Sequence, residues 1–482
     1  MTFNSLIFWA FFAVVLLPYF TVLRRSARWQ NLWLLLASYV FYGWTDWRMV
    51  PLLIAVTVLF YFLGIKIQQS NESSPRQASR LTTIGVLIGV GVLFYFKYLG
   101  FCVEQFSELL VSMGLQAHRS TLSIIMPVGI SFFTFKLMSY VIEVHRGNIA
   151  PSRDFTAFAT FVAFFPTILS GPIDRPGLFL PQLSSPRQCI PTRVADGLKR
   201  VLWGLFIKMC IADRWAPYTD AVLGDPSAHN TTSLLLASAI YLIQMYADFC
   251  GYSEMAIGVA QVMRLRVAEN FRRPFMAQNV AEYWRWWHIS LTTWITDYVF
   301  MPLNLALRNW ATWGLILATI FNMVVIGAWH GANWTYVCFG LYHGILVAIV
   351  AVTDRRRKRF ERQHGLKNNE LYKWSNRLVT FVLVAFGAVL FRSESVTAFG
   401  HVIGAMGNGF AMPYNFGLYD TAKGVLCIAL LMFREWKDEY AKPIHLMHNA
   451  NVVVETASVA ALIVLTMLMA NFGSTSFIYF QF

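Results

Sequence analysis

The sequence predicts an all-α integral membrane protein that crosses the bilayer many times. Of its 482 residues, 57% are hydrophobic and only 13% are charged, whereas soluble domains carry about a quarter charged residues. The hydrophobic residues form long continuous runs, and a spanning helix needs about 20 mostly apolar residues. Membrane strands would instead alternate in polarity over roughly ten residues. We therefore expect a single membrane-embedded domain over residues 1–482, with about ten to twelve membrane helices.

Basic residues stand mainly in short loops between the apolar runs, although the net charge is +14. Such loops orient membrane proteins by lying in the cytoplasm, so no nucleic-acid partner is expected. Residues 6–23 form the first expected span, and Arg24, Arg25 and Arg28 follow it. If residues 31–44 and 49–65 both cross, the first two basic loops share the cytoplasmic side. The N-terminus would then face outward.

Two features predict departures from simple spans. Pro127 and Gly129 interrupt residues 124–147, which indicates either a broken helix that lines a cavity or a plain kinked span. Residues 197–215 carry Lys208 among apolar side chains, and we expect this segment at the membrane interface. The other segments expected in or along the membrane are residues 82–100, 101–120, 155–170, 234–263, 281–300, 313–329, 334–352, 376–391, 396–410, 422–433 and 452–470.

Two carboxylates, Asp248 and Glu254, lie within the long apolar segment 234–263. Carboxylates at membrane depth are costly and usually have a partner or a function. Asp248 therefore either contacts a substrate or holds the structure through hydrogen bonds to neighbouring helices. The pattern favours neither interpretation over the other.

The densest group of polar and aromatic residues lies between residues 281 and 300. A helix there would place Trp287 and His288 on one stripe and Asp297 on roughly the other side. Arg285 helps to make this segment too polar to cross a bilayer alone, so we expect it in the interface or inside the protein. Tryptophan and arginine together suit a site that holds a charged or hydroxylated ligand.

An uncharged span over residues 313–329 ends at Trp329 and leads to His330. Gly331 allows the backbone to turn, and Asn333 follows one turn after His330. In a low-dielectric site a neutral imidazole can take a proton from a hydroxyl nucleophile, which is general-base catalysis of acyl transfer. The alternative for both His330 and His288 is a histidine that only hydrogen-bonds across helices.

Signatures of several other chemistries are missing from the sequence. The chain has no nucleophile elbow, His-Glu-x-x-His motif, P-loop or Gly-x-Gly-x-x-Gly motif, so covalent serine hydrolysis and nucleotide chemistry are poorly supported. Its six cysteines show no paired spacing. We therefore expect neither a disulfide framework nor a metal site.

Several runs of the sequence resemble the membrane-bound O-acyltransferase family, especially its bacterial branch that acetylates alginate, peptidoglycan and cellulose. In chain order these runs are PVGISFFTF, FFPTILSGPIDR, YADFCGYSEMAIG, FRRPFMAQNVAEYWRWWHISLTTWITDYVFMPL, GAWHGANWTYV and FIYFQF. The resemblance implies helices around a central tunnel in the bacterial inner membrane. It also implies cytoplasmic acetyl-CoA as donor substrate with no permanently bound cofactor, a glycan acceptor, and a separate periplasmic acetyltransferase as partner.

The resemblance assigns roles to individual residues. The family's Trp-His-Gly histidine falls on His330, and its Arg-x-Trp-His-x-Ser histidine falls on His288. With these two as catalytic residues, the predicted substrate-binding residues are Arg285, Trp287, Asp297, Trp329, Asn333 and Asp248. The chain departs from relatives at residues 304–310, where NLALRNW replaces a common Gly-Gly-Asn-Arg loop. Donor contacts are therefore not assigned.

Three functions fit the sequence. The first is transfer of acetyl from acetyl-CoA toward an exported polysaccharide, with His330 as general base. The second is transfer of another acyl group, such as D-alanine to teichoic acid or a fatty acid to a lipid. The third is a proton-coupled transporter or flippase that uses Asp248, Glu254 and His330, although the internal repeats common in transporters are not evident.

Overall fold

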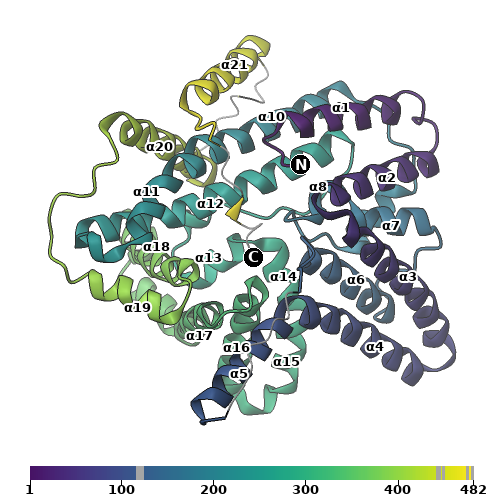
Figure 1. Cartoon of the computed structure of the whole chain (residues 1–482), viewed down its shortest axis with the longest axis horizontal. Coiled ribbons are helices and arrows are strands. Elements are labelled where there is room, and N and C mark those ends of the chain that lie inside the picture. The colour runs from purple at the N-terminus through teal and green to yellow at the C-terminus, as the bar shows by residue number, and fades with distance from the viewer. Residues whose placement is uncertain (116–123, 441–446, 448–450, 474–476, 479–482) are drawn as a thin grey trace. The chain divides into compact units, whose positions relative to one another are not determined.

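The computed structural model describes residues 1–115, 124–440, 447, 451–473 and 477–478. All regular secondary structure within these residues is helical, as predicted (Figure 1). The end of the expected segment 101–120 and the last four residues of FIYFQF lie outside them. The chain forms two compact units, Met1–Val201 with Met255–Ala268, and Leu202–Glu254 with Glu269–Phe482. The expectation of one domain stays a prediction.

The helices follow one another with short connections in both units. The first unit contains α1 (Leu6–Phe20), α2 (Ala27–Asp46), η1 (Trp47–Met49), α3 (Val50–Ser73), α4 (Pro75–Leu93), η2 (Phe94–Tyr98), α5 (Leu99–Ser112), α6 (Ile130–His145), α7 (Phe155–Ala163), α8 (Phe165–Ile168), α9 (Pro176–Phe179), η3 (Leu180–Leu183) and most of α10 (Pro191–Ile207). The second contains η4 (Lys208–Ala212), α11 (Asp213–Gly224), η5 (Pro226–Ala228), most of α12 (Thr231–Val262), η6 (Pro274–Met276), α13 (Val280–Trp286), α14 (Ile289–Ile295), η7 (Thr296–Phe300), α15 (Met301–Ala306), η8 (Arg308–Trp310), α16 (Ala311–His330), α17 (Trp334–Gln363), η9 (Leu366–Asn368), α18 (Glu370–Arg392), α19 (Val396–Ala405), α20 (Leu418–Tyr440) and α21 (Val452–Met469).

Seven helical stretches among the described residues are long and apolar enough to cross a membrane. They are Ala27–Ser73, Pro75–Ser112, Thr231–Val262, Arg308–His330, Trp334–Gln363, Glu370–Arg392 and Val452–Met469. The first of these is 47 residues long because α2, η1 and α3 continue into one another. Leu6–Phe20 and Val396–Ala405 are apolar but shorter. The multi-pass prediction is confirmed, and the predicted number of crossings stays a prediction.

The predicted interruption at Gly129 is present in the first unit. Helix α6 begins only at Ile130, and Gly129 has φ +75°. That left-handed conformation favours glycine, and a Cβ at Gly129 would lie 2.2 Å from the carbonyl oxygen of Ile168. The broken-helix interpretation is therefore confirmed, because the chain approaches another backbone segment where a side chain has no room.

Helices α16 and α17 form a close hairpin in the second unit (Figure 1). Helix α17 starts where the Asn333 Oδ1 accepts a hydrogen bond from the Thr335 amide at 3.0 Å. Glycines then let the two backbones approach, because a Cβ at Gly327 would lie 2.1 Å from the Tyr336 carbonyl oxygen. Small residues serve the same purpose in many membrane helix pairs. The hairpin fixes the end of α16, which carries His330.

Replacing Gly340 with alanine is expected to lower the stability of this hairpin. The added Cβ would lie 2.5 Å from the Met323 carbonyl oxygen, so the helices must separate, at a cost of about 1–3 kcal/mol. Thermal midpoints of the detergent-purified protein measure the effect. The matched control is Gly91→Ala, whose added Cβ meets nothing within 4 Å. Equal midpoints for both variants would contradict the close packing.

Candidate active site

His288 lies between two short helices that the sequence had suggested were one. Helix α13 ends at Trp286, α14 begins at Ile289, and His288 itself has φ +46° and ψ +51°. The prediction of a continuous helix over residues 281–300 is therefore wrong at this point. A left-handed backbone is unfavourable for residues with a side chain. Here the Ile289 amide donates to the Asn270 carbonyl oxygen at 2.9 Å and so helps to hold the turn.

The Asn270 side chain fixes the imidazole of His288. Its Oδ1 lies 3.0 Å from His288 Nδ1 and accepts from the Ser290 hydroxyl at 2.8 Å, while its Nδ2 donates to Ser253 Oγ at 3.0 Å. Because an amide oxygen can only accept, Nδ1 of the neutral ring must carry the proton. The other nitrogen, Nε2, then presents a lone pair. His288 is thus held as a hydrogen-bond acceptor.

Burial lowers the pKa of His288 to about 3. Both His288 and Asn270 are fully buried, and a buried imidazolium is disfavoured because it loses its hydration. His288 is therefore neutral at physiological pH. Such a weak base is suited to accepting a hydrogen bond and not to removing a proton from a hydroxyl group.

This lowered pKa makes the folded protein sensitive to acid. Between pH 6.5 and 3 the unfolded chain binds a proton at His288 that the folded chain does not, so stability falls as pH falls. From pH 7.5 to pH 4.5 the loss from this group is expected to be about 2–3 kcal/mol. Thermal midpoints over that range measure it against His288→Asn, which also tolerates a left-handed backbone. Parallel profiles for the two proteins would contradict the assignment.

His330, at the end of α16, lies beside His288. The two ring centroids are 6.4 Å apart, and the Trp329 ring is 5.6 Å from His288 and 5.1 Å from His330. On its other side His330 packs against Phe391 of α18 at 5.1 Å. His330 is only 3% exposed. The fold thus brings together both histidines that the sequence indicated, 42 positions apart in the chain, within an aromatic environment.

The other predicted site residues are more scattered. Trp287 is buried and stacks on Tyr283, with ring centroids 5.4 Å apart. Arg285 and Asp297 are exposed. Asn333 caps α17 and donates from Nδ2 to the Glu394 carbonyl oxygen at 2.7 Å. The substrate-binding roles proposed for these residues stay predictions.

Asp248 belongs to a buried charge cluster. Its Oδ1 is 2.5 Å from Nζ of Lys208, which also pairs with Asp213 at 2.6 Å. Lys208 is 1% exposed, so the expectation that it lies at the membrane interface is wrong. The two carboxylates supply the partners that a buried ammonium requires. Burial lowers the pKa of Lys208, but the carboxylates outweigh it and raise that pKa above its ordinary value.

The C-terminal segment also reaches this charge cluster. The Ile478 amide donates to Asp248 Oδ2 at 2.8 Å, and Phe477 lies with its ring centre 4.4 Å from Lys208 Nζ. One residue along α12, Phe249 packs against His288 with ring centroids 4.7 Å apart. Helix α12 therefore contacts the charge cluster through Asp248 and the histidine site through Phe249. The FIYFQF run thus includes residues that pack near the site.

Comparison with known proteins places the chain in a class of membrane enzymes. Residues 41–386 match the membrane-bound O-acyltransferase family, and the chain belongs to that family. It is 36% identical over 408 residues to a probable alginate O-acetylase of Azotobacter vinelandii, covering 84% of this chain and 78% of that protein. It is 30% identical to a peptidoglycan O-acetyltransferase of Helicobacter pylori, covering 82% of this chain and 77% of that protein.

A more distant similarity connects the chain with another acyl group. It is 31% identical over 286 residues to a teichoic acid D-alanyltransferase of Streptococcus thermophilus, covering 55% of this chain and 67% of that protein. The family and these relatives support an O-acyltransferase activity over the transporter hypothesis. The chain is therefore an O-acyltransferase embedded in a membrane.

Proposed function

We propose that the protein moves acetyl groups from cytoplasmic acetyl-CoA toward hydroxyl groups of an exported polysaccharide, with His330 as general base. The observation that carries the proposal is the buried pair of imidazoles 6.4 Å apart, one of them fixed as an acceptor. The polysaccharide acceptor is supported by relatives named for alginate and peptidoglycan acetylation. We place the enzyme in the bacterial inner membrane, with a periplasmic acetyltransferase as its partner.

The two histidines have different roles in this mechanism. His330 takes the proton from the acceptor hydroxyl as its oxygen attacks the thioester carbonyl carbon. The new C–O ester bond forms, the C–S bond breaks, and the thiolate leaves and takes up a proton. His288 is a positioning residue, because its low pKa makes it a weak base while Nε2 can accept a hydrogen bond. The aromatic walls exclude water, which would otherwise hydrolyse the thioester.

Isotope tracing in membrane vesicles tests the proposal. Inside-out vesicles that contain the protein are given acetyl-CoA labelled in the acetyl carbonyl, and label in alkali-labile esters of the glycan fraction is counted. We expect label with this protein and only background in vesicles from a strain in which its gene is deleted. Equal label in both preparations would overturn the proposed function.

The alternative within the family is transfer of D-alanine, and the similarity to a teichoic acid D-alanyltransferase favours its inclusion. The same vesicles can be given D-alanine labelled and loaded on its carrier protein. Ester-linked D-alanine without ester-linked acetate would replace the first proposal by the second.

A further inference from the structure

A polar cavity opens next to the histidine site, within the second unit. It has a volume of about 300 Å³ and is bounded by the ends of α11, α18 and α19. Its polar lining includes Arg392, Ser393, Glu394 and His401. A second cavity of about 730 Å³ shares Pro226 and His401 with it and continues along α19. We call the two together the α19 groove. Their volumes are in the range of small-ligand sites in proteins.

The groove is joined to His330 by consecutive residues of α18. Phe391 packs against the His330 ring at 5.1 Å, and the next residue, Arg392, lines the groove. The Asn333 side chain, three positions after His330, donates to the carbonyl oxygen of Glu394, which also lines the groove. A ligand in the groove would therefore lie beside the aromatic wall of the histidine site.

The groove lies at the end of the hairpin remote from the basic loop. Helices α17 and α18 are antiparallel, since Asn333 before α17 bonds to Glu394 after α18, and Tyr372 early in α18 bonds to Glu361 late in α17. The basic residues from Arg355 to Arg359 are near the end of α17. Basic loops favour the cytoplasmic side. The groove therefore suits a ligand that approaches from outside the cell membrane.

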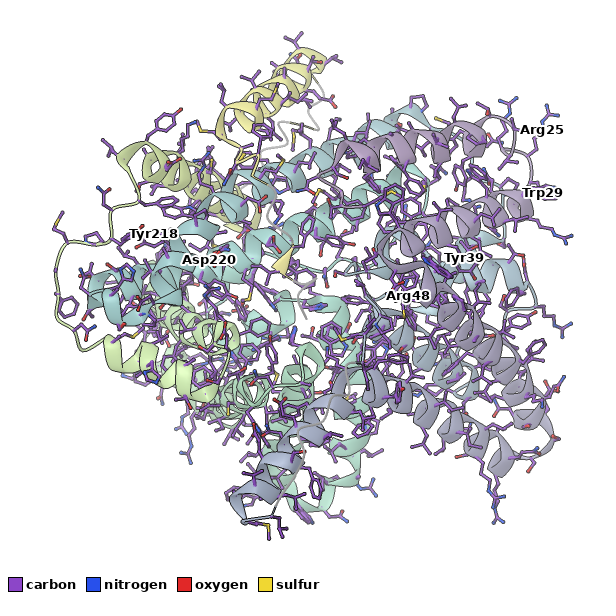
Figure 2. The ribbon with its side chains drawn as sticks, viewed as in Figure 1. Arg25, Trp29, Tyr39, Arg48, Tyr218 and Asp220 are labelled. Atoms are coloured by element: carbon purple, nitrogen blue, oxygen red, sulfur yellow. The ribbon has the colours of Figure 1, made fainter. Side chains whose placement is uncertain are left out.

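Arg392 is held in a fixed orientation at the groove. Its guanidinium donates to Asp220 Oδ1 at 2.9 Å and lies 5.3 Å from the centre of the Tyr241 ring. Figure 2 shows Asp220 on α11. A guanidinium has five N–H donors in a planar fork, so one bond to Asp220 leaves capacity for a ligand. Glu394 and Ser393 add acceptors. Donors and acceptors in one small space are suited to hydroxyl groups, which both donate and accept.

The charges around the groove discriminate between glycan classes. Arg392 is the only Lys or Arg among the residues that line the two cavities, and Asp220 neutralises it. Glu394 lines the groove, and Asp225 lies between the lining residues Gly224 and Pro226. The local balance is therefore negative. A polyanionic glycan would be repelled, whereas an uncharged one would not.

We propose that the α19 groove binds the acceptor of the transfer reaction and that this acceptor is an uncharged, hydroxyl-rich glycan chain. The inference rests on the proposed acyl transfer and adds the location and charge of the acceptor. It separates this chain from its alginate-acetylating relatives, because alginate is a chain of uronate carboxylates. Arg392 and His401 hydrogen-bond to sugar hydroxyls, and Glu394 excludes anionic chains.

Binding of two matched oligosaccharides tests the proposal. The full-length protein in lipid nanodiscs is titrated with a neutral β-1,4-glucan hexamer and with a uronate hexamer, and each Kd is measured by saturation-transfer NMR. We expect the neutral hexamer to bind at least about tenfold more tightly. Glu394→Lys should reduce this ratio about tenfold, and the isosteric Glu394→Gln should reduce it less. His401→Leu should weaken binding of the neutral hexamer about tenfold.

The test distinguishes failure of the groove from failure of the proposed function. His330→Ala should bind the neutral hexamer like the wild type, since His330 does not line the groove. Equal affinity for both hexamers, or no saturable binding of either, would overturn the groove proposal even if vesicles still form acetyl esters. First appearance of the acyl group on a partner polypeptide would also overturn it.

Discussion

Cells that carry His330→Ala in place of the wild-type protein are expected to lose ester-linked acetate from the exported glycan. General-base catalysis contributes about 10²–10⁴ in rate, so transfer should fall by at least about a hundredfold. The aromatic rings of Trp329 and Phe391 that pack on His330 remain. The measurement is alkali-released acetate per unit of purified glycan, with equal amounts of both proteins confirmed in the membrane fraction.

A second variant separates loss of the base from loss of packing. His330→Gln keeps a polar side chain of similar length but has no basic nitrogen, so it should be as inactive as His330→Ala while retaining more of the wild-type thermal stability. Substantial activity in His330→Gln would show that hydrogen bonding at this position is sufficient. The general-base assignment would then be abandoned.

Removal of the Lys208 ammonium should produce the largest loss of stability among these variants. Lys208→Met leaves Asp213 and Asp248 buried without their cation, and breaking a buried ion pair from one side costs about 3–5 kcal/mol. The carboxylates are 3% and 2% exposed, so water cannot readily replace the lost partner. Fluorescence-detected size-exclusion chromatography after stepwise heating gives the midpoint.

A compensated variant tests the cause. Lys208→Met combined with Asp213→Asn and Asp248→Asn removes the uncompensated charges and should recover much of the lost stability. The same protein addresses Asp248 as a substrate ligand. Recovery of stability together with acyl transfer would assign Asp248 a structural role, whereas stable but inactive protein would support substrate contact. Failure to recover stability would contradict charge imbalance as the cause.

The sequence indicated much of the site because its strongest signals are chemical. Histidines beside tryptophans are conspicuous in an apolar chain, and both His288 and His330 lie together in the structure. Asn270 was missed as a partner because the interaction joins positions 18 residues apart through a turn. The only local signal was a polar amide at the start of a dense aromatic stretch. Its complete burial depends on the tertiary fold.

The failed expectations also have physical causes. Helical periodicity placed residues 281–300 on one helix, but the bond between the Ile289 amide and Asn270 stabilises a break that periodicity does not encode. Lys208 was assigned to the interface because a lone lysine in an apolar segment usually extends to water. Two carboxylates, 5 and 40 residues later in the chain, pair with it instead.

The backbone at His288 has a consequence for how this position tolerates change. A left-handed conformation costs a residue with a side chain about 1–2 kcal/mol, and glycine would avoid that cost. Folding alone would therefore select glycine at position 288, and the imidazole is present against that preference. Variant libraries scored for expression and for acyl transfer should rank the residues at this position in opposite orders.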